Sequence, residues 1–264
     1  IGWIIVTAVF LYNLVIKSGR FEVIKDSIAG VTGDRRVQAL LIAFAFGAFL
    51  EGAAGFGTPV AIAAAMLAGL GFKPLYAAGL CLIANTAPVA FGAIGIPIIT
   101  AGAVTGLEVM SISQMVGRQV PFLAFFLSFW LVFVMAGWRK TMEVWPAILV
   151  GGGSFALTQW FTANYVSPML PDIAASLTAI AALTVFLRVW RPPSLWLFPG
   201  EPPASVRVRR HDPGTVLAAW VPFLLLTVLI ADWGLGPVKA LLGVASFGIP
   251  LTPIDCSIVA GGQT

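Results

Sequence analysis

The sequence has few charged residues. Asp, Glu, Lys and Arg make up 10% of its 264 residues, whereas soluble domains carry about 25%. Hydrophobic residues make up 59% of the chain, and its mean hydropathy is +0.97. A chain of this composition has too little polar surface to cover a water-soluble body, so we expect a lipid bilayer to surround it.

Cysteine and histidine are also scarce. The two cysteines, Cys81 and Cys256, lie far apart, and His211 is the single histidine. These numbers argue against a disulfide framework and against a zinc site, so we expect no metal. We expect His211, in an arginine-rich loop, to be solvated.

Ser154 follows Gly152 and Gly153 in an apolar segment, an arrangement that would suit an intramembrane serine protease. Such an enzyme needs a histidine base within the membrane, and His211 lies outside it. The motifs H-E-x-x-H and G-x-S-x-G do not occur in the sequence either. We therefore do not expect an enzyme.

Long apolar stretches dominate what is present. Residues 37–138 contain four charged side chains, and a membrane crossing takes about 20 apolar residues. Residues 144–187 form a second such region, which we expect to be a helical hairpin broken at 164–168. The sequence predicts an all-α, polytopic transmembrane bundle, a single integral membrane domain over residues 1–264. Because the chain begins inside an apolar run without Met, we expect it to be a fragment.

Twelve of the fifteen Lys and Arg residues lie in three segments, at about residues 17–36, 139–143 and 188–213. The positive-inside rule places these three segments together on the cytoplasmic side. The net charge of +4 is then a property of loops, and we expect no nucleic-acid partner.

Glycine and proline interrupt the apolar region at two places. The first interruption, residues 51–59 (EGAAGFGTP), combines Glu51 with three glycines and Pro59, which cannot continue a helix. The second, residues 85–97 (NTAPVAFGAIGIP), begins with Asn85 and Thr86. Non-helical backbone at membrane depth occurs where it lines a cavity, and paired broken helices bind anions through their N-terminal N–H groups. The two stretches therefore predict an anion site, although small residues of this kind also mediate helix packing.

Glu51 is the main candidate for chemistry, because an intramembrane carboxylate is costly and indicates function. We interpret it as a proton carrier; the alternative is a residue at a helix end that reaches interfacial water. Arg118 opens an apolar run and is expected to extend to the interface rather than pair with a carboxylate. Asp172, after Pro171, is expected near a helix N-terminus, where the helix dipole stabilises it.

Two long strings carry a resemblance to a known family. Residues 49–62 (FLEGAAGFGTPVAI) and 79–92 (GLCLIANTAPVAFG) resemble the bacterial L-lactate permeases, and the similarity extends from residue 1 to about residue 250. Members of that family are longer, so the resemblance implies one half of an inverted-repeat transporter, with broken and re-entrant helices, that does not transport alone.

The resemblance implies a multi-pass protein of the bacterial inner (plasma) membrane that takes up L-lactate by proton symport, together with D-lactate and glycolate. Its partners are then small 2-hydroxy monocarboxylates and the lipid bilayer, with no cofactor beyond the co-transported proton. We expect Glu51 to carry the proton and the substrate to contact Gly52, Gly55, Gly57, Thr58, Asn85, Thr86 and Gly92. A passive anion channel, another carboxylate transporter of the same superfamily and a purely structural membrane subunit remain alternatives.

Overall fold

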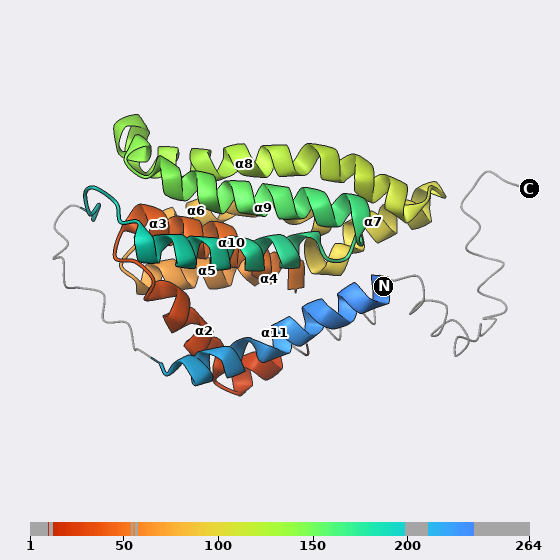
Figure 1. The fold of residues 1–264 in the computed structure, drawn as a ribbon, viewed down its shortest axis with the longest axis horizontal. Helices are drawn as coiled ribbons and strands as arrows, with labels where there is room; N and C mark the ends of the chain where they lie inside the picture. Colours follow the sequence, from red (N-terminus) through yellow and green to blue (C-terminus); the bar gives the residue numbers. More distant parts are fainter. Residues whose placement is uncertain (1–9, 11–12, 54, 56–57, 199–210, 235–264) are drawn as a thin grey trace, which may run out of the picture.

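The computed structural model describes residues 10, 13–53, 55, 58–198 and 211–234, and the regular structure within these ranges is helical (Figure 1). The expected all-α bundle is therefore confirmed. Its helices are α2 (Arg20–Ala29), α3 (Arg35–Ala39), η1 (Leu40–Phe46), α4 (Gly47–Ala53), α5 (Thr58–Gly69), α6 (Pro74–Asn85), η2 (Val89–Phe91), α7 (Gly92–Thr105), α8 (Val109–Met142), α9 (Trp145–Tyr165), α10 (Pro171–Val189) and α11 (Pro213–Gly234).

The central element is one helical run made of α3, η1 and α4. Asp34 caps its first turn, because the Asp34 carboxylate accepts a hydrogen bond from the backbone N–H of Arg36 at 2.9 Å. Every residue from Arg35 to Ala53 is buried, and the apolar side chains on all faces of η1 and α4 fit a helix that is surrounded on every side. A polar side chain on this run, such as Glu51, is therefore held inside the bundle.

The chain reverses after α4 and returns as α5, which packs against η1 and α4. The close approach is made at Gly47, where a Cβ atom would lie 4.0 Å from Ala63 Cβ. With 12 residues, α5 is about 18 Å long, shorter than a bilayer core of about 30 Å. The helical run and α5 thus form a hairpin with one short arm, and α6 packs against both arms.

Three long helices, α8, α9 and α10, lie side by side along the bundle (Figure 1). The hairpin predicted within residues 144–187 is present as α9 and α10, joined at residues 166–170. Near its end α8 breaks at Gly137, which has φ 73°. This break turns Trp138 back onto Phe129, with 5.7 Å between the ring centroids.

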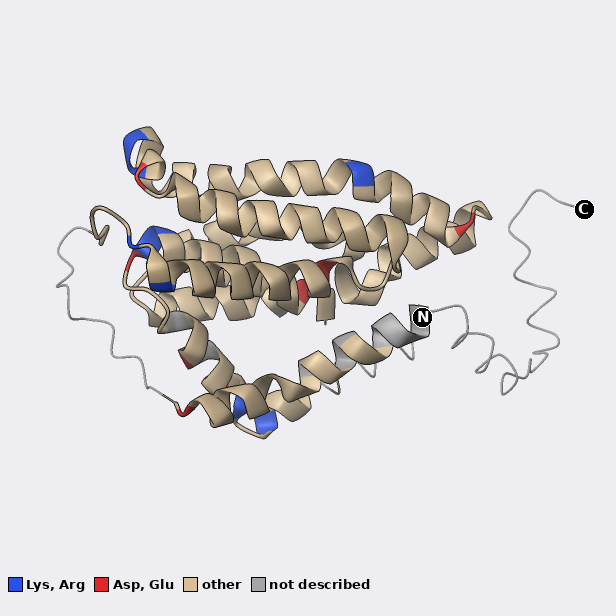
Figure 2. Cartoon of the chain, viewed as in Figure 1, with Lys and Arg blue, Asp and Glu red and all other residues tan. Residues whose placement is uncertain are grey.

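Charged residues gather at the end of the bundle where α3 begins and α8 ends (Figure 2). Arg36 is fully buried there, and its guanidinium group donates to both carboxylate oxygens of Asp34. It also donates to Glu143 and to the backbone carbonyls of Lys140 and Ser194. The three basic segments of the sequence therefore each contribute to one cluster, and that this end faces the cytoplasm stays a prediction.

The helix α11 packs against α2, away from the other long helices. His211, just before α11, lies with its Nε2 atom 2.9 Å from the Asp26 carboxylate of α2. The prediction that His211 is merely solvated is therefore wrong. Its partner lies 185 positions away in the sequence, so only the packing of the two helices brings them together.

Three of the described helical segments are long and apolar enough to cross a membrane: Arg35–Ala53, Val109–Met142 and Pro171–Val189. The pair Pro74–Asn85 and Val89–Thr105 passes the same test together and is bent by 66°. This bend confirms the broken helix expected from the prolines and glycines that follow Asn85.

Candidate functional site

The first interruption lies between α4 and α5. Gly55 has φ 62°, a backbone conformation that glycine adopts without strain, and its N–H donates to the carbonyl of Leu50 at 3.3 Å. A Cβ atom on Gly55 would lie 2.6 Å from Ala93 Cβ and 3.1 Å from the Ala93 nitrogen. Gly55 therefore allows the first interruption to touch the second.

The second interruption runs from the end of α6 to the start of α7. After Asn85 the chain forms the single turn η2, and then Ala93, Ile94 and Gly95 all take left-handed conformations. Such a conformation costs roughly 1–3 kcal/mol for a residue other than glycine, and it is a clear outlier for the β-branched Ile94. Strained backbone of this kind clusters at functional sites.

Glu51, on the last turn of α4, lies where the two interruptions meet. Its side chain is 5% exposed, which does not fit the alternative of a helix-end residue in interfacial water. The Asn85 side chain lies near it, and Gly92 packs on it so closely that a Cβ there would lie 2.7 Å from Oε1. The structure thus brings together Glu51, Asn85, Gly92 and Gly55.

The remaining predicted site residues have other surroundings. Gly52 is covered by α10, because a Cβ on Gly52 would lie 2.9 Å from Asp172 Cβ and 3.0 Å from the nitrogen of Ile173. Thr86 is exposed, and its hydroxyl group donates back to the carbonyl of Leu82 at 3.4 Å. Thr58 is the first residue of α5. The Thr58 side chain and the whole of Gly57 lie outside the described part of the chain.

Asp172 is a site residue that sequence reasoning missed. It is the second residue of α10, so its expected place near a helix N-terminus is confirmed. It is also 1% exposed and sits against the end of α4 that carries Glu51. The sequence did place this carboxylate between two apolar spans. An ionisable residue within the membrane is a functional candidate by default. Arg118, in contrast, is exposed on α8.

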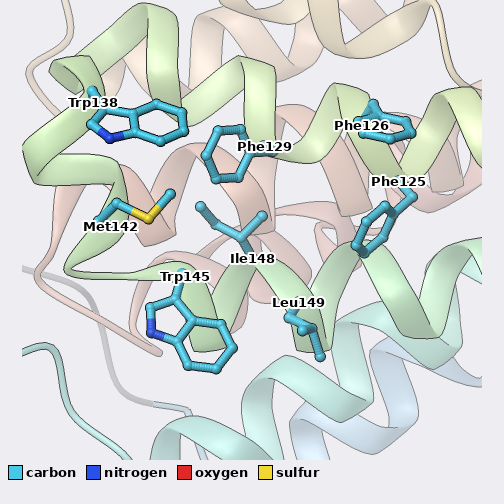
Figure 3. A pocket seen from close by; sticks show the side chains of 8 residues that line it. All are labelled: Phe125, Phe126, Phe129, Trp138, Met142, Trp145, Ile148 and Leu149. Atoms are coloured by element: carbon cyan, nitrogen blue, oxygen red, sulfur yellow. The ribbon is translucent and has the colours of Figure 1, made fainter.

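An apolar groove lies elsewhere, between α8 and α9, and measures about 390 Å³ (Figure 3). Its lining residues are Phe125, Phe126, Phe129, Trp138, Met142, Trp145, Ile148 and Leu149. This lining has no cation, no amide side chain and no hydroxyl group to hold a carboxylate. Apart from the indole N–H groups of Trp138 and Trp145, the groove offers no donor for an anion, so it fits the expected anion site poorly.

The sequence model of the L-lactate permease family matches residues 1–253. The L-lactate permease of Bacillus subtilis (strain 168) is 57% identical over 251 residues, a match that covers 92% of this chain and 45% of that protein. The glycolate permease GlcA of Escherichia coli (strain K12) is 54% identical over 253 residues, covering 91% and 45%. The L-lactate permease of the same strain is 53% identical over 246 residues, covering 91% and 44%.

The chain thus spans about half the length of the curated relatives it matches. No solved structure matches it. The apolar helices and these relatives make it a multi-pass protein of the bacterial inner membrane. With a family match over 253 of its 264 residues and relatives more than 50% identical, the chain belongs to the L-lactate permease family.

Proposed function

We propose that this chain contributes the substrate and proton site of a symporter that takes up L-lactate, together with D-lactate and glycolate, with protons across the plasma membrane. The observation that carries the proposal is the meeting of two interrupted helix pairs at the buried carboxyl group of Glu51. The matched relatives, two L-lactate permeases and a glycolate permease, support the choice of 2-hydroxy monocarboxylates.

The substrate carboxylate is assigned to backbone N–H groups at this junction. Both α5 and α7 begin there, and the first N–H groups of a helix have no partner within the helix and attract anions. Gly55 and Gly92 let the two interruptions and Glu51 approach each other closely, and these glycines and Gly57 stay predicted substrate contacts. Asn85 supplies a side-chain amide that binds the carboxylate or the 2-hydroxyl group, and Thr58 stays a predicted substrate contact.

Glu51 is assigned as the proton carrier, and no cofactor other than the co-transported proton is needed. One lactate anion that moves with one proton carries no net charge, which removes most of the cost of taking the anion through a low-dielectric interior. Transport of this kind breaks no covalent bond in the substrate. Gly52 is assigned to helix packing, and Thr86 stays a predicted substrate contact.

The test is uptake of labelled L-lactate by the intact protein in proteoliposomes, with and without an inward proton gradient. We expect accumulation above equilibrium only with the gradient, with competition by glycolate and none by acetate. Uptake that merely equilibrates in both conditions would replace the symporter with a passive anion pore.

The variant Glu51→Gln should abolish gradient-driven accumulation, because its amide cannot take up and release a proton. The matched control is Glu108→Gln, which removes a carboxylate at the exposed N-terminus of α8 and should leave accumulation unchanged. Normal accumulation by Glu51→Gln would remove Glu51 from the proton path.

A further inference from the structure

A second buried carboxyl group stands beside Glu51 and has no role in the function proposed above. Asp172 Oδ1 accepts a hydrogen bond from Gln159 Nε2 on α9, at 2.8 Å. The other oxygen, Oδ2, is buried without a hydrogen-bond partner among the described residues. A fully buried carboxyl group that is half satisfied needs a physical explanation.

The two carboxyl groups belong to helices in direct contact. Gly52, the residue after Glu51, has no side chain, and a Cβ atom there would lie 2.9 Å from Asp172 Cβ. Both carboxyl groups are therefore buried next to the same contact between α4 and α10. The two groups therefore repel each other when both are ionised.

Three acceptor oxygens in this cluster lack a donor: Glu51 Oε2, Gln159 Oε1 and Asp172 Oδ2 are buried and unpartnered among the described residues. Buried acceptors without donors are costly. A proton on either carboxyl group turns one of these acceptors into an O–H donor, which removes one unpartnered acceptor. One proton therefore improves the hydrogen bonding of the cluster as well as its charge.

The surrounding described helices supply no cation for the pair. Around Asp172, α9 carries only the exposed Tyr165 as a titratable group, while η1 and α7 carry none. Around Glu51, α5 and η2 carry none, and α6 carries Tyr76 and Cys81, whose side chains are ordinarily neutral at pH 7. Among the described residues, a bound proton is therefore what neutralises one of the two carboxylates.

We propose that Glu51 and Asp172 share a single proton and act as a pair in proton coupling, an inference that rests on the proposed symport. The N-terminus of α10 and the N–H of Gln159 both favour the negative charge on Asp172. In this proposal the proton sits on Glu51, arrives from one aqueous side and leaves to the other. Gln159 is a positioning residue that holds the Asp172 carboxylate.

The test compares the pH dependence of gradient-driven L-lactate uptake in the intact protein and in Asp172→Asn. Removal of the neighbouring negative charge makes Glu51 easier to ionise, so the pH of half-maximal uptake should fall by about one unit or more. Asp172→Glu should restore the normal profile, and Glu108→Gln should not change it. An unchanged profile in a folded Asp172→Asn protein would make Asp172 purely structural and overturn the proposal.

A second measurement does not depend on transport or on the folding of Asp172→Asn. Infrared spectroscopy of the intact protein at neutral pH should detect a band of a protonated buried carboxyl group that Glu51→Gln abolishes. No such band, or two bands assigned to the pair, would contradict a shared proton. If the unsubstituted protein fails to accumulate lactate while the single band is present, the proposed function fails and the shared proton stands.

Discussion

At the scale of single residues, Gly92 defines the space that the Glu51 side chain occupies. A Cβ atom at position 92 would lie 2.7 Å from Glu51 Oε1, 3.2 Å from Cγ and 3.4 Å from Cδ. Because Glu51 is buried on the central helical run, its carboxyl group has little room in which to move away. Gly92 is therefore important through the side chain it lacks.

We predict that Gly92→Ala reduces gradient-driven lactate accumulation on the order of tenfold or more, because the added methyl group displaces the carboxyl group of Glu51. The measurement is uptake in proteoliposomes with equal amounts of folded protein. Gly79→Ala is the matched control, since a Cβ at Gly79 on α6 meets no atom within 4 Å. Equal uptake by the two variants would show that the position of Glu51 is less constrained than its contacts indicate.

At the scale of the helices, three consecutive glycines on α9 illustrate how this bundle packs. A Cβ on Gly151 would lie 2.8 Å from Leu183 Cδ1 of α10. One on Gly152 would lie 3.0 Å from Ser128 Cβ of α8 and closer still to its hydroxyl oxygen. Gly153 meets no atom within 4 Å. Gly151 and Gly152 thus allow α9 to approach one neighbour each, as small residues do between membrane helices.

This packing predicts a graded effect of alanine substitutions on the stability of the bundle. Gly152→Ala should lower the free energy of unfolding by about 1–3 kcal/mol, because the contact involves a buried Cβ atom of the facing helix. Gly151→Ala should cost less, since the flexible end of Leu183 is able to shift, and Gly153→Ala should have little effect. Unfolding of the purified protein in detergent measures the order, and a destabilised Gly153→Ala with a normal Gly152→Ala would refute it.

At the scale of the whole molecule, the charged cluster joins segments that lie far apart in the chain. All five N–H groups of Arg36 have acceptors, on Asp34, Lys140, Glu143 and Ser194. Glu143 also accepts hydrogen bonds from the Lys140 ammonium group and the Ser194 hydroxyl group. Hydrogen bonds from Lys140, Ser194 and Arg36 lower the pKa of Glu143 from its usual 4.5 to about 2.

The lowered pKa predicts how acid affects this end of the bundle. Because the folded-state pKa lies below the unfolded value, the stabilisation by Glu143 is complete above about pH 4.5 and is lost as the pH falls towards 2. Glu143→Gln should therefore be less stable than the unsubstituted protein at neutral pH, with a difference that shrinks from pH 4.5 to 2. Thermal unfolding across this range measures it, and a difference independent of pH would rule out the carboxylate as its source.

Local sequence features predicted many elements of the fold correctly. Prolines and glycines fixed the two interruptions and the bend after Asn85, because these residues alter backbone geometry whatever surrounds them. Apolar length gave the α9–α10 hairpin for the same kind of local reason. The left-handed conformation of Ile94 was not predictable, since a β-branched residue adopts it only when neighbouring structure imposes it.

The sequence by itself determined that this protein lies in a lipid bilayer, that it is helical and which family it belongs to. Composition, the length of apolar runs and the strings around Glu51 and Asn85 are properties of the chain alone. Only the tertiary structure decided which distant groups meet. The contact of Asp172 with Gly52, of Gly55 with Ala93 and of His211 with Asp26 depends on how helices pack. Packing results from many weak contacts between distant segments, so the local sequence around a residue does not predict its partner across the bundle.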